Sequence, residues 1–460
     1  MLSAYKNCLK IPELRKRLFF TFAIIALCRL ASCIPCPGVD PAALSELFKQ
    51  MGNNKGTGGV MDMLNLFSGG AMENFAIGAL GIMPYISASI ILQLMTPVIP
   101  SLNKMVREGE SGQQKYNQIM RGITVIICIV QGLIFSLAMM RPEKLNLGNG
   151  MSVVTNPGVG FIISTVIILT GGGMLVMWLG EMITEHGVGN GASLIITVNI
   201  IARLPGALLS LFTLVWGGAA TGGAELTKLH LLILLVMFFL VTAGAIALTQ
   251  GMRKVPIRYA QRVTGVGNTS QVQTSYLPLM VNYSNVMPII FAGAILSFPM
   301  MLLRFAPDWR IFHWIMPFFQ YGSYCYLVSY GLLILLFSFF WVANQFNPIQ
   351  IADDLQKRSG YIPGIRPGQP TAEFLDHSMT RITLAGAIAL TALAIFPMIL
   401  SNWMSVPPVI AQFFGGTSLL IIVGVGLDTL RQIETHLLNR HYDGFMSKGS
   451  LRSREGSHPI

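Results

Sequence analysis

Two short stretches of this 460-residue chain have residue types and spacings that suggest chemistry. Cys33 and Cys36 form a C-x-x-C pair, a spacing that permits a disulfide or a redox couple. Pro35 lies between them in a predicted turn, and no second cysteine pair exists to complete a zinc site, so a structural role is favoured. Residues 187–191 read GVGNG, like a phosphate loop. No strand is predicted before them and they join two apolar runs, so we expect a tight turn.

The sequence contains no complete catalytic motif. Residues 424–428, GVGLD, approximate the aspartyl intramembrane protease motif but have one residue too many. Neither a G-x-x-x-x-G-K-[ST] nucleotide loop nor an H-E-x-x-H metal motif is present. Ionisable residues are almost absent from the centres of the apolar runs, where ion-coupled transporters usually carry them. We therefore expect no enzyme activity and no cofactor, and a passage that opens without binding a charged solute.

The composition is that of a membrane protein. Hydrophobic residues make up 53% of the chain and charged residues only 11%, whereas soluble proteins carry about 25% charged residues. Lipid is the simplest solvent for the excess apolar surface. The net charge of +11 could indicate a nucleic-acid partner. The basic residues fall between the apolar runs, however, which favours a membrane protein with basic cytoplasmic loops.

Apolar runs of approximately membrane-spanning length recur along the chain. They cover residues 18–34, 75–95, 122–140, 161–180, 192–209, 230–249, 286–303, 322–343, 383–403 and 413–430. Because a spanning helix needs about 20 apolar residues, we predict an all-α polytopic membrane protein with about ten transmembrane helices.

The positions of Lys and Arg predict the orientation. If the N-terminus is cytoplasmic, 22 of the 31 basic residues lie in cytoplasmic segments, and Arg29 and Arg203 are among the other nine. Both termini are therefore expected in the cytoplasm. Two cytoplasmic segments, near 251–285 and 344–382, are long and basic, which suits docking of a partner. The alternative is that their charges only set the topology.

The region before the second run is unusual. Residues 65–74, NLFSGGAMEN, are too polar and glycine-rich to span the membrane. Non-helical backbone at membrane depth requires protein or water around it, so we predict a short re-entrant segment. Ile82 and Ile86 follow it and share one face of a helix, a pattern typical of packing as well as of pore lining.

Several of these residues occur in motifs that resemble the SecY family of protein-conducting channels. The motifs are residues 34–40 (IPCPGVD), 79–90 (ALGIMPYISASI), 180–185 (GEMITE) with 187–191, Leu277-Pro278-Leu279 with Asn282 and Met287-Pro288, 364–368 (GIRPG) and 415–421 (GGTSLLI). The similarity covers nearly the whole chain.

The resemblance implies an hourglass-shaped channel of two five-helix halves related by an inverted repeat. The halves would be residues 1–210 and 211–435, followed by a cytoplasmic tail, 436–460. The implied pore ring is Ile82, Ile86, Ile196, Ile290 and Ile421, with Ala192 standing where a further isoleucine is expected. The implied plug is Asn65, Leu66, Phe67, Ser68, Gly69, Gly70, Ala71, Met72, Glu73 and Asn74. The implied lateral gate includes Ser87, Gln93 and Asn282, and the implied docking residues are Arg366, Arg253, Lys254 and Arg258.

The same resemblance implies a function in protein transport. Unfolded secretory chains would cross the bacterial cytoplasmic (inner) membrane through the pore, and apolar segments would leave sideways into the lipid bilayer. The implied partners are small SecE- and SecG-type membrane subunits, the SecA motor ATPase and the ribosome, whose RNA would meet the basic loops. Two alternatives are a small-solute secondary transporter, which requires ionisable residues at the midplane, and an intramembrane hydrolase, which requires a nucleophile or metal set.

Overall fold

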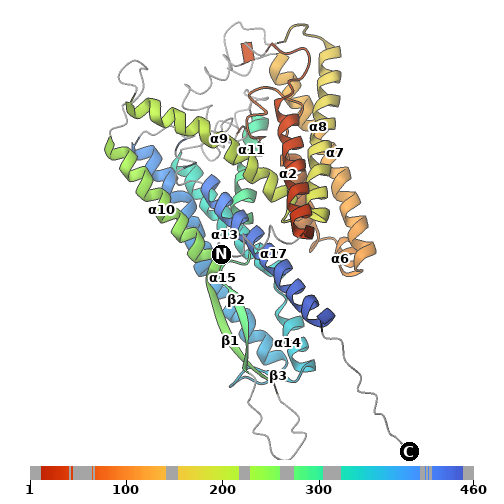
Figure 1. Cartoon of the computed structure of the whole chain (residues 1–460), viewed down its shortest axis with the longest axis vertical. Coiled ribbons are helices and arrows are strands. Elements are labelled where there is room, and N and C mark those ends of the chain that lie inside the picture. The colour runs from red at the N-terminus through yellow and green to blue at the C-terminus, as the bar shows by residue number, and fades with distance from the viewer. Residues whose placement is uncertain are drawn as a thin grey trace, which may run out of the picture.

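The computed structural model describes residues 12–40, 43–44, 65, 68–140, 154–216, 228–259, 274–303, 323–404, 410, 413 and 417–448. Helices dominate this part of the chain (Figure 1). They are α2 (Pro12–Cys33), α5 (Met83–Met95), α6 (Pro100–Arg107), α7 (Glu110–Met140), α8 (Val159–His186), α9 (Gly191–Trp216), α10 (Lys228–Gln250), α11 (Met287–Leu303), α13 (Tyr324–Gln345), α14 (Pro348–Lys357), α15 (Gln369–Met404) and α17 (Thr417–Lys448). The strands are β1 (Met252–Tyr259), β2 (Thr274–Met280) and β3 (Gly360–Tyr361).

The prediction of an all-α polytopic membrane fold is confirmed. Within the described residues, six helices are long and apolar enough to cross a membrane, namely α7, α8, α9, α10, α13 and α15. Helices α5 and α6 would provide a seventh span if they counted as one, although the chain bends by 107° between them. Each of the ten predicted runs overlaps a helix, but the exact count of ten spans remains a prediction.

The second predicted run, 75–95, is helical over only part of its length. Residues up to Ile82 form turns, and α5 begins at Met83. Pro84 occupies the first turn of α5, where a missing N–H costs nothing and the fixed φ favours a helix start. Gly81 has a φ of +55°, which lies outside the right-handed helical region and is favoured only by glycine. A regular helix therefore cannot extend back through this residue. The expected start of this helix at residue 75 was therefore wrong.

Two expected boundaries fall inside helices. The proposed division of the chain at residue 210 lies within α9, which continues to Trp216, so residues 211–216 extend a helix of the first half. The expected cytoplasmic tail from residue 436 begins inside α17, which runs on to Lys448. The division into two halves itself remains a prediction.

A small antiparallel sheet, which the sequence did not predict, joins the two long basic loops. Its strand order is β2-β1-β3. Strands β1 and β2 form a hairpin in which Met252 pairs with Met280, and β3 pairs with the far end of β1 through Arg258 and Tyr361. The sheet lies at one end of the molecule, beside α14 and the start of α15 (Figure 1).

Helices from both parts of the chain share one large apolar core. This core contains buried residues of α2, α5, α8, α9, α10, α11, α13, α15 and α17. The turn from α8 to α9 is tight, as predicted, and Gly189 adopts a φ of +90° there. A Cβ at Gly191 would lie 1.8 Å from the carbonyl oxygen of Gly180, so only glycine allows these helices to approach at the turn.

The C-x-x-C pair carries free thiols at the end of α2. Cys33 is exposed and Cys36 is buried. The backbone N–H of Cys36 donates to the carbonyl of Phe75 at 2.9 Å, and Pro35 forms a β-bridge with Ala76. These contacts anchor the turn after α2 to the segment that leads into α5.

Candidate functional site

The five residues of the predicted pore ring are all buried. Ile82 stands at the N-cap of α5, and the others lie on α5, α9, α11 and α17. All belong to the same apolar core, and they are Ile82, Ile86, Ile196, Ile290 and Ile421, with exposed fractions of 1, 7, 2, 2 and 0%. The five side chains thus come from four helices and share one extended apolar core. Their action as a closing ring remains a prediction.

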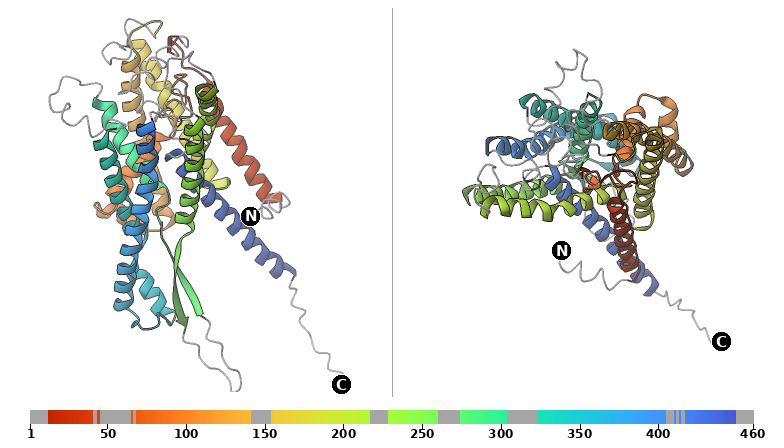
Figure 2. Two further views of the ribbon diagram at one scale, coloured as in Figure 1. Left: turned by 90° about the vertical axis from the view of Figure 1, so that its left-hand side faces the viewer. Right: turned by 90° about the horizontal axis from the view of Figure 1, so that it is seen from above.

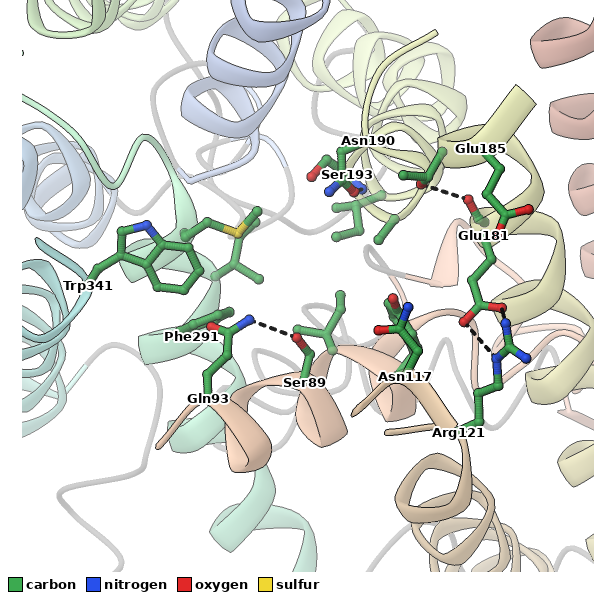
Figure 3. A pocket seen from close by; sticks show the side chains of 18 residues that line it. Ser89, Gln93, Asn117, Arg121, Glu181, Glu185, Asn190, Ser193, Phe291 and Trp341 are labelled. Atoms are coloured by element: carbon green, nitrogen blue, oxygen red, sulfur yellow. Dashed lines mark hydrogen bonds and ion pairs between the residues drawn. The ribbon is translucent and has the colours of Figure 1, made fainter. Parts of the chain in front are cut away.

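A cavity of about 400 Å³ adjoins three of these isoleucines. Ile86, Ile196 and Ile290 line it, and Ala192 lines it as well, at the position where a further isoleucine was expected. Phe291 and Trp341 contribute aromatic surface on the side of α11 and α13, as Figure 3 shows. The cavity therefore lies between helices of the first and second parts of the chain.

The opposite wall of the cavity is polar. Arg121 of α7 binds Glu181 of α8 through two contacts, Nε to Oε1 at 3.2 Å and Nη2 to Oε2 at 2.8 Å (Figure 3). Such a two-pronged ion pair fixes both side chains in one plane. Asn117, Asn190 and other polar groups complete this wall. The cavity can therefore hold water and peptide groups on one side and apolar side chains on the other.

The three predicted lateral-gate residues have different surroundings. Gln93 of α5 donates to the hydroxyl of Ser89 at 3.0 Å and lines the cavity. Ser87 is half-buried on α5 and does not line it. Asn282 is buried in the turn between β2 and α11, where its amide donates to the carbonyl of Asn285 at 2.9 Å. The structure therefore does not bring these three side chains together in one hydrogen-bonded group.

A second cavity of about 510 Å³ shares Gln93 and Trp341 with the first. Amide side chains dominate its lining: Gln93, Gln113, Asn344 and Gln345, with Thr96 and Tyr116. Amides offer both donors and acceptors. This recess between α5, α7 and α13 is therefore suited to a polar chain segment.

The predicted plug is a compact turn. Leu66 and Phe67 lie outside the described residues. Asn65 binds both the side chain and the backbone of Glu73. Its amide donates to the carboxylate at 3.1 Å, and its Oδ1 accepts from the backbone N–H at 3.3 Å. Ala71 and Met72 are buried. The segment thus folds onto itself before α5 begins.

The remaining plug residues complete that turn. Ser68 donates its hydroxyl to the carbonyl of Asn65. Gly69 and Gly70 have φ values of +67° and +89°, which glycine adopts without strain. Glu73 and Asn74 are exposed. The predicted reversal of the chain at the glycine pair is therefore present, whereas its role as a plug remains a prediction.

The predicted docking residues are exposed on the small sheet and beside it. Arg253, Lys254 and Arg258 are exposed on β1. Arg366 is exposed between two glycines of positive φ, Gly364 at +87° and Gly368 at +98°. The four basic side chains therefore belong to two loops that the sheet connects.

The tip that carries Arg366 is held in place. The hydroxyl of Thr371 donates to the carbonyl of Arg366 at 2.8 Å, and Ile365 packs against the apolar cluster beneath the sheet. Tyr283 belongs to the same cluster, and burial raises the pKa of its hydroxyl. The loop is thus a fixed structure.

Three side chains beside the plug segment were not singled out as functional. Arg29 of α2 and Arg203 of α9 were counted only as basic residues for the topology, and Asn199 of α9 was not considered. Arg29 donates to Asn199 and to the carbonyl of Gly69, and Arg203 forms an ion pair with Glu73. The available signal was the presence of two arginines inside otherwise apolar runs, since such residues are costly in a membrane.

Comparison with known proteins gives consistent matches. The SecY family model matches residues 76–430. The protein translocase subunit SecY of Chlamydia trachomatis is 38% identical over 470 residues, covering 98% of this chain and 100% of the relative.

Two solved structures share the fold. In one, the plug domain of the SecY protein stabilises the closed state of the translocation channel and maintains a membrane seal; the TM-score is 0.57, the identity 15%, and 91% of each chain is covered. The other is Sec61 in the canine ribosome-channel complex from the endoplasmic reticulum, with a TM-score of 0.59, 16% identity and 91% of each chain covered. At these identities the structures support the fold alone.

Proposed function

Because the chain belongs to the SecY family, we propose that it is the channel-forming subunit of a protein translocase, through which unfolded secretory chains cross the membrane and apolar segments enter lipid. The observation that carries this proposal is the cavity between α5, α9 and α11, with three of the predicted ring isoleucines in its wall. The family assignment favours this channel over a small-solute transporter.

The chemistry of the cavity suits a substrate of variable sequence. A chain in transit presents every kind of side chain, so specific binding would stop it. Isoleucines adapt their packing to a passing chain, and an apolar constriction discourages water and ion flow. The polar wall around Arg121 and Glu181 provides partners for peptide groups before they reach the constriction.

Sideways release would rely on the hydrophobic effect. Burial of each methylene in lipid contributes about 0.8 kcal/mol, so a fully apolar segment of about 20 residues gains many kcal/mol on leaving the channel. The amide-lined recess that Gln93 and Trp341 share with the cavity supports an exit between α5 and α13. We propose that Ser87, Gln93 and Asn282 belong to the helices or turns that move when this exit opens.

The energy for secretion must come from a partner, because the sequence has no nucleotide-binding loop. We propose that a SecA-type motor and the ribosome dock on the sheet and the tip that carry Arg253, Lys254, Arg258 and Arg366. Their exposure on an ordered surface supports this assignment. We further propose small SecE- and SecG-type subunits, two inverted halves, and a bacterial inner-membrane location with both termini in the cytoplasm.

Transport by purified components tests the function directly. The chain would be reconstituted into liposomes with the small subunits, the motor and a radiolabelled secretory precursor. We expect ATP-dependent protection of the precursor from added protease. If the precursor is not protected and the same vesicles show saturable uptake of a small solute, the channel function is rejected and the transporter function is favoured.

A further inference from the structure

Two arginines lie within apolar stretches of helices, one from Leu18 to Cys33 of α2 and one in α9. Arg29 belongs to the last part of α2, and Arg203 to the middle of α9. A charged side chain at membrane depth is costly, so it usually has a partner and a function. Their partners lie in the segment 65–74, which precedes α5.

Both arginines bind that segment, from two different helices. Arg29 donates through Nη2 to the carbonyl of Gly69 at 3.2 Å and through Nη1 to Oδ1 of Asn199 at 3.0 Å. Arg203 forms an ion pair with the carboxylate of Glu73. Asn199 and Arg203 are both on α9, so α2 and α9 together hold the two ends of one turn.

Glycine at position 69 makes the first contact possible. Gly69 has a φ of +67°, and a Cβ there would lie 2.3 Å from Nη1 of Arg29 and 2.9 Å from Oδ1 of Asn199. Any larger residue would displace the guanidinium from the carbonyl that it binds. The contact between Arg29 and the carbonyl at position 69 therefore requires glycine at that position.

The second contact is positioned from within the segment. Asn65 binds the carboxylate and the backbone N–H of Glu73 at once, which directs the carboxylate toward Arg203. Phe75, directly after the segment, is buried with a φ of +44°. A large residue adopts this conformation only when its surroundings hold it. Asn65 and the described residues 68–75 are therefore held in one defined conformation.

We propose that Arg29 and Arg203 are positioning residues that hold segment 65–74 in the closed channel, and that opening requires both contacts to break. This inference rests on the proposed function and assigns the residues that would set the closed state. Since α2 and α9 contribute one arginine each, a relative movement of these helices would release the segment.

A charge swap tests the ion pair. Channels carrying Glu73→Arg, Arg203→Glu or both substitutions would be recorded in planar bilayers without a precursor. We expect each single variant to raise the open probability by up to roughly fivefold, which is the upper end of the range for a partly exposed ion pair. The double variant should return close to the parent channel, because the pair is restored with its charges exchanged.

Two further variants complete the test of the arginine contacts. Asn156→Arg adds a positive charge to an exposed position before α8 and should leave the open probability unchanged. Gly69→Ala probes the Arg29 contact without changing any charge and should raise it. Elution of each variant as a single peak from gel filtration in detergent would verify folding. Single variants that match the parent, or a double variant as open as the single ones, would overturn the proposal.

Precursor transport in the same preparations distinguishes a failure of the arginine contacts from a failure of the proposed channel function. If the parent channel transports the precursor while no variant changes the open probability, the arginine contacts do not set the closed state but the channel function stands. If the parent transports nothing under any condition, the proposed function itself fails.

Discussion

Ile86 and Ile91 lie on the same helix, α5, in different surroundings. Ile86 is 7% exposed and lines the 400 Å³ cavity, whereas Ile91 is 43% exposed. Side chains of identical chemistry thus contact the channel interior in one case and the outer surface of the helix bundle in the other. Substitutions at these two positions can therefore distinguish a role of Ile86 in sealing the channel from a contribution to the stability of the helix.

We predict that Ile86→Gly raises the ion conductance of the resting channel several-fold, and that Ile91→Gly does not. Glycine costs either position about 1 kcal/mol of helix propensity, so the backbone penalty is matched. Only the first substitution removes apolar surface from the constriction. Planar-bilayer recordings of the two variants provide the measurement. Equal conductance would argue against a seal at Ile86.

The second prediction at the scale of single residues concerns Arg366. We expect Arg366→Glu to insert and fold normally but to block motor-driven secretion, and Arg366→Lys to restore it only in part, because a planar guanidinium donates several hydrogen bonds in fixed directions. The fixed tip between Gly364 and Gly368 supports a docking role. The measurement is SecA-dependent transport of a precursor into vesicles.

Arg358→Glu is the matched control for that experiment. Arg358 is exposed at the C-cap of α14 in the same loop, so its reversal changes the loop charge by the same amount. If Arg366 only supports the topology, the two variants should behave alike. Normal secretion with Arg366→Glu would remove the docking role.

At the scale of elements, the small sheet makes one unit of two loops that are far apart in the sequence. Strand β3 reaches β1 through Gly360, whose Cβ position lies 3.0 Å from the ring of Tyr259 and 3.4 Å from Ile257. A side chain at this position would push β3 away from β1. The pairing of β3 with β1 therefore requires a residue without a side chain at position 360.

We predict that Gly360→Val separates the loops and exposes the β1–β2 hairpin to trypsin at Arg253, Lys254 and Arg258. The rate of cleavage in detergent, followed by mass spectrometry, measures the effect. Cleavage at Lys104 and Lys115, on α6 and α7, provides an internal control and should not change. An unchanged rate at the hairpin would show that β3 contributes nothing to its stability.

The sequence predicted the helices better than it predicted this sheet. Long apolar runs specify a membrane helix almost by themselves, because lipid leaves the backbone no other partner. Strand β3 has only two residues, and its partner lies about a hundred positions away in the chain. Such pairing is determined by the tertiary fold and leaves no periodic pattern in the sequence.

The candidate site divides in the same way. The ring isoleucines were available from their motifs, and the structure buries all five. The contacts of Arg29 and Arg203 with residues 69 and 73 could not be predicted from a motif, because they join residues that lie up to 130 positions apart in the sequence. The start of α5 was also misplaced, since apolar residues before Pro84 continue the hydrophobic run without continuing the helix.

At the scale of the whole molecule, the two ends differ. The sheet, α14 and the start of α15 lie together at one end, where the exposed basic residues of β1 also lie (Figures 1 and 2). The start of α2 packs near the α8–α9 turn and the later part of α17 through Leu14, Val188 and Ile433. The turn after α2 packs at the other end of that helix, where Val39 forms a bridge with Val154.

This asymmetry predicts an orientation that a native cysteine can report. Positive charge is retained on the cytoplasmic side, so the sheet should face the cytoplasm and the turn after α2 should face outward. Cys33 is exposed with a free thiol near that turn. In a background where the other five cysteines are replaced by serine, we expect a membrane-impermeant maleimide to label Cys33 in intact spheroplasts. Arg358→Cys, in a background lacking all native cysteines, should react only after the membrane is permeabilised. The reverse pattern would invert the topology and remove the docking surfaces from the cytoplasm, because a motor and a ribosome could no longer reach them.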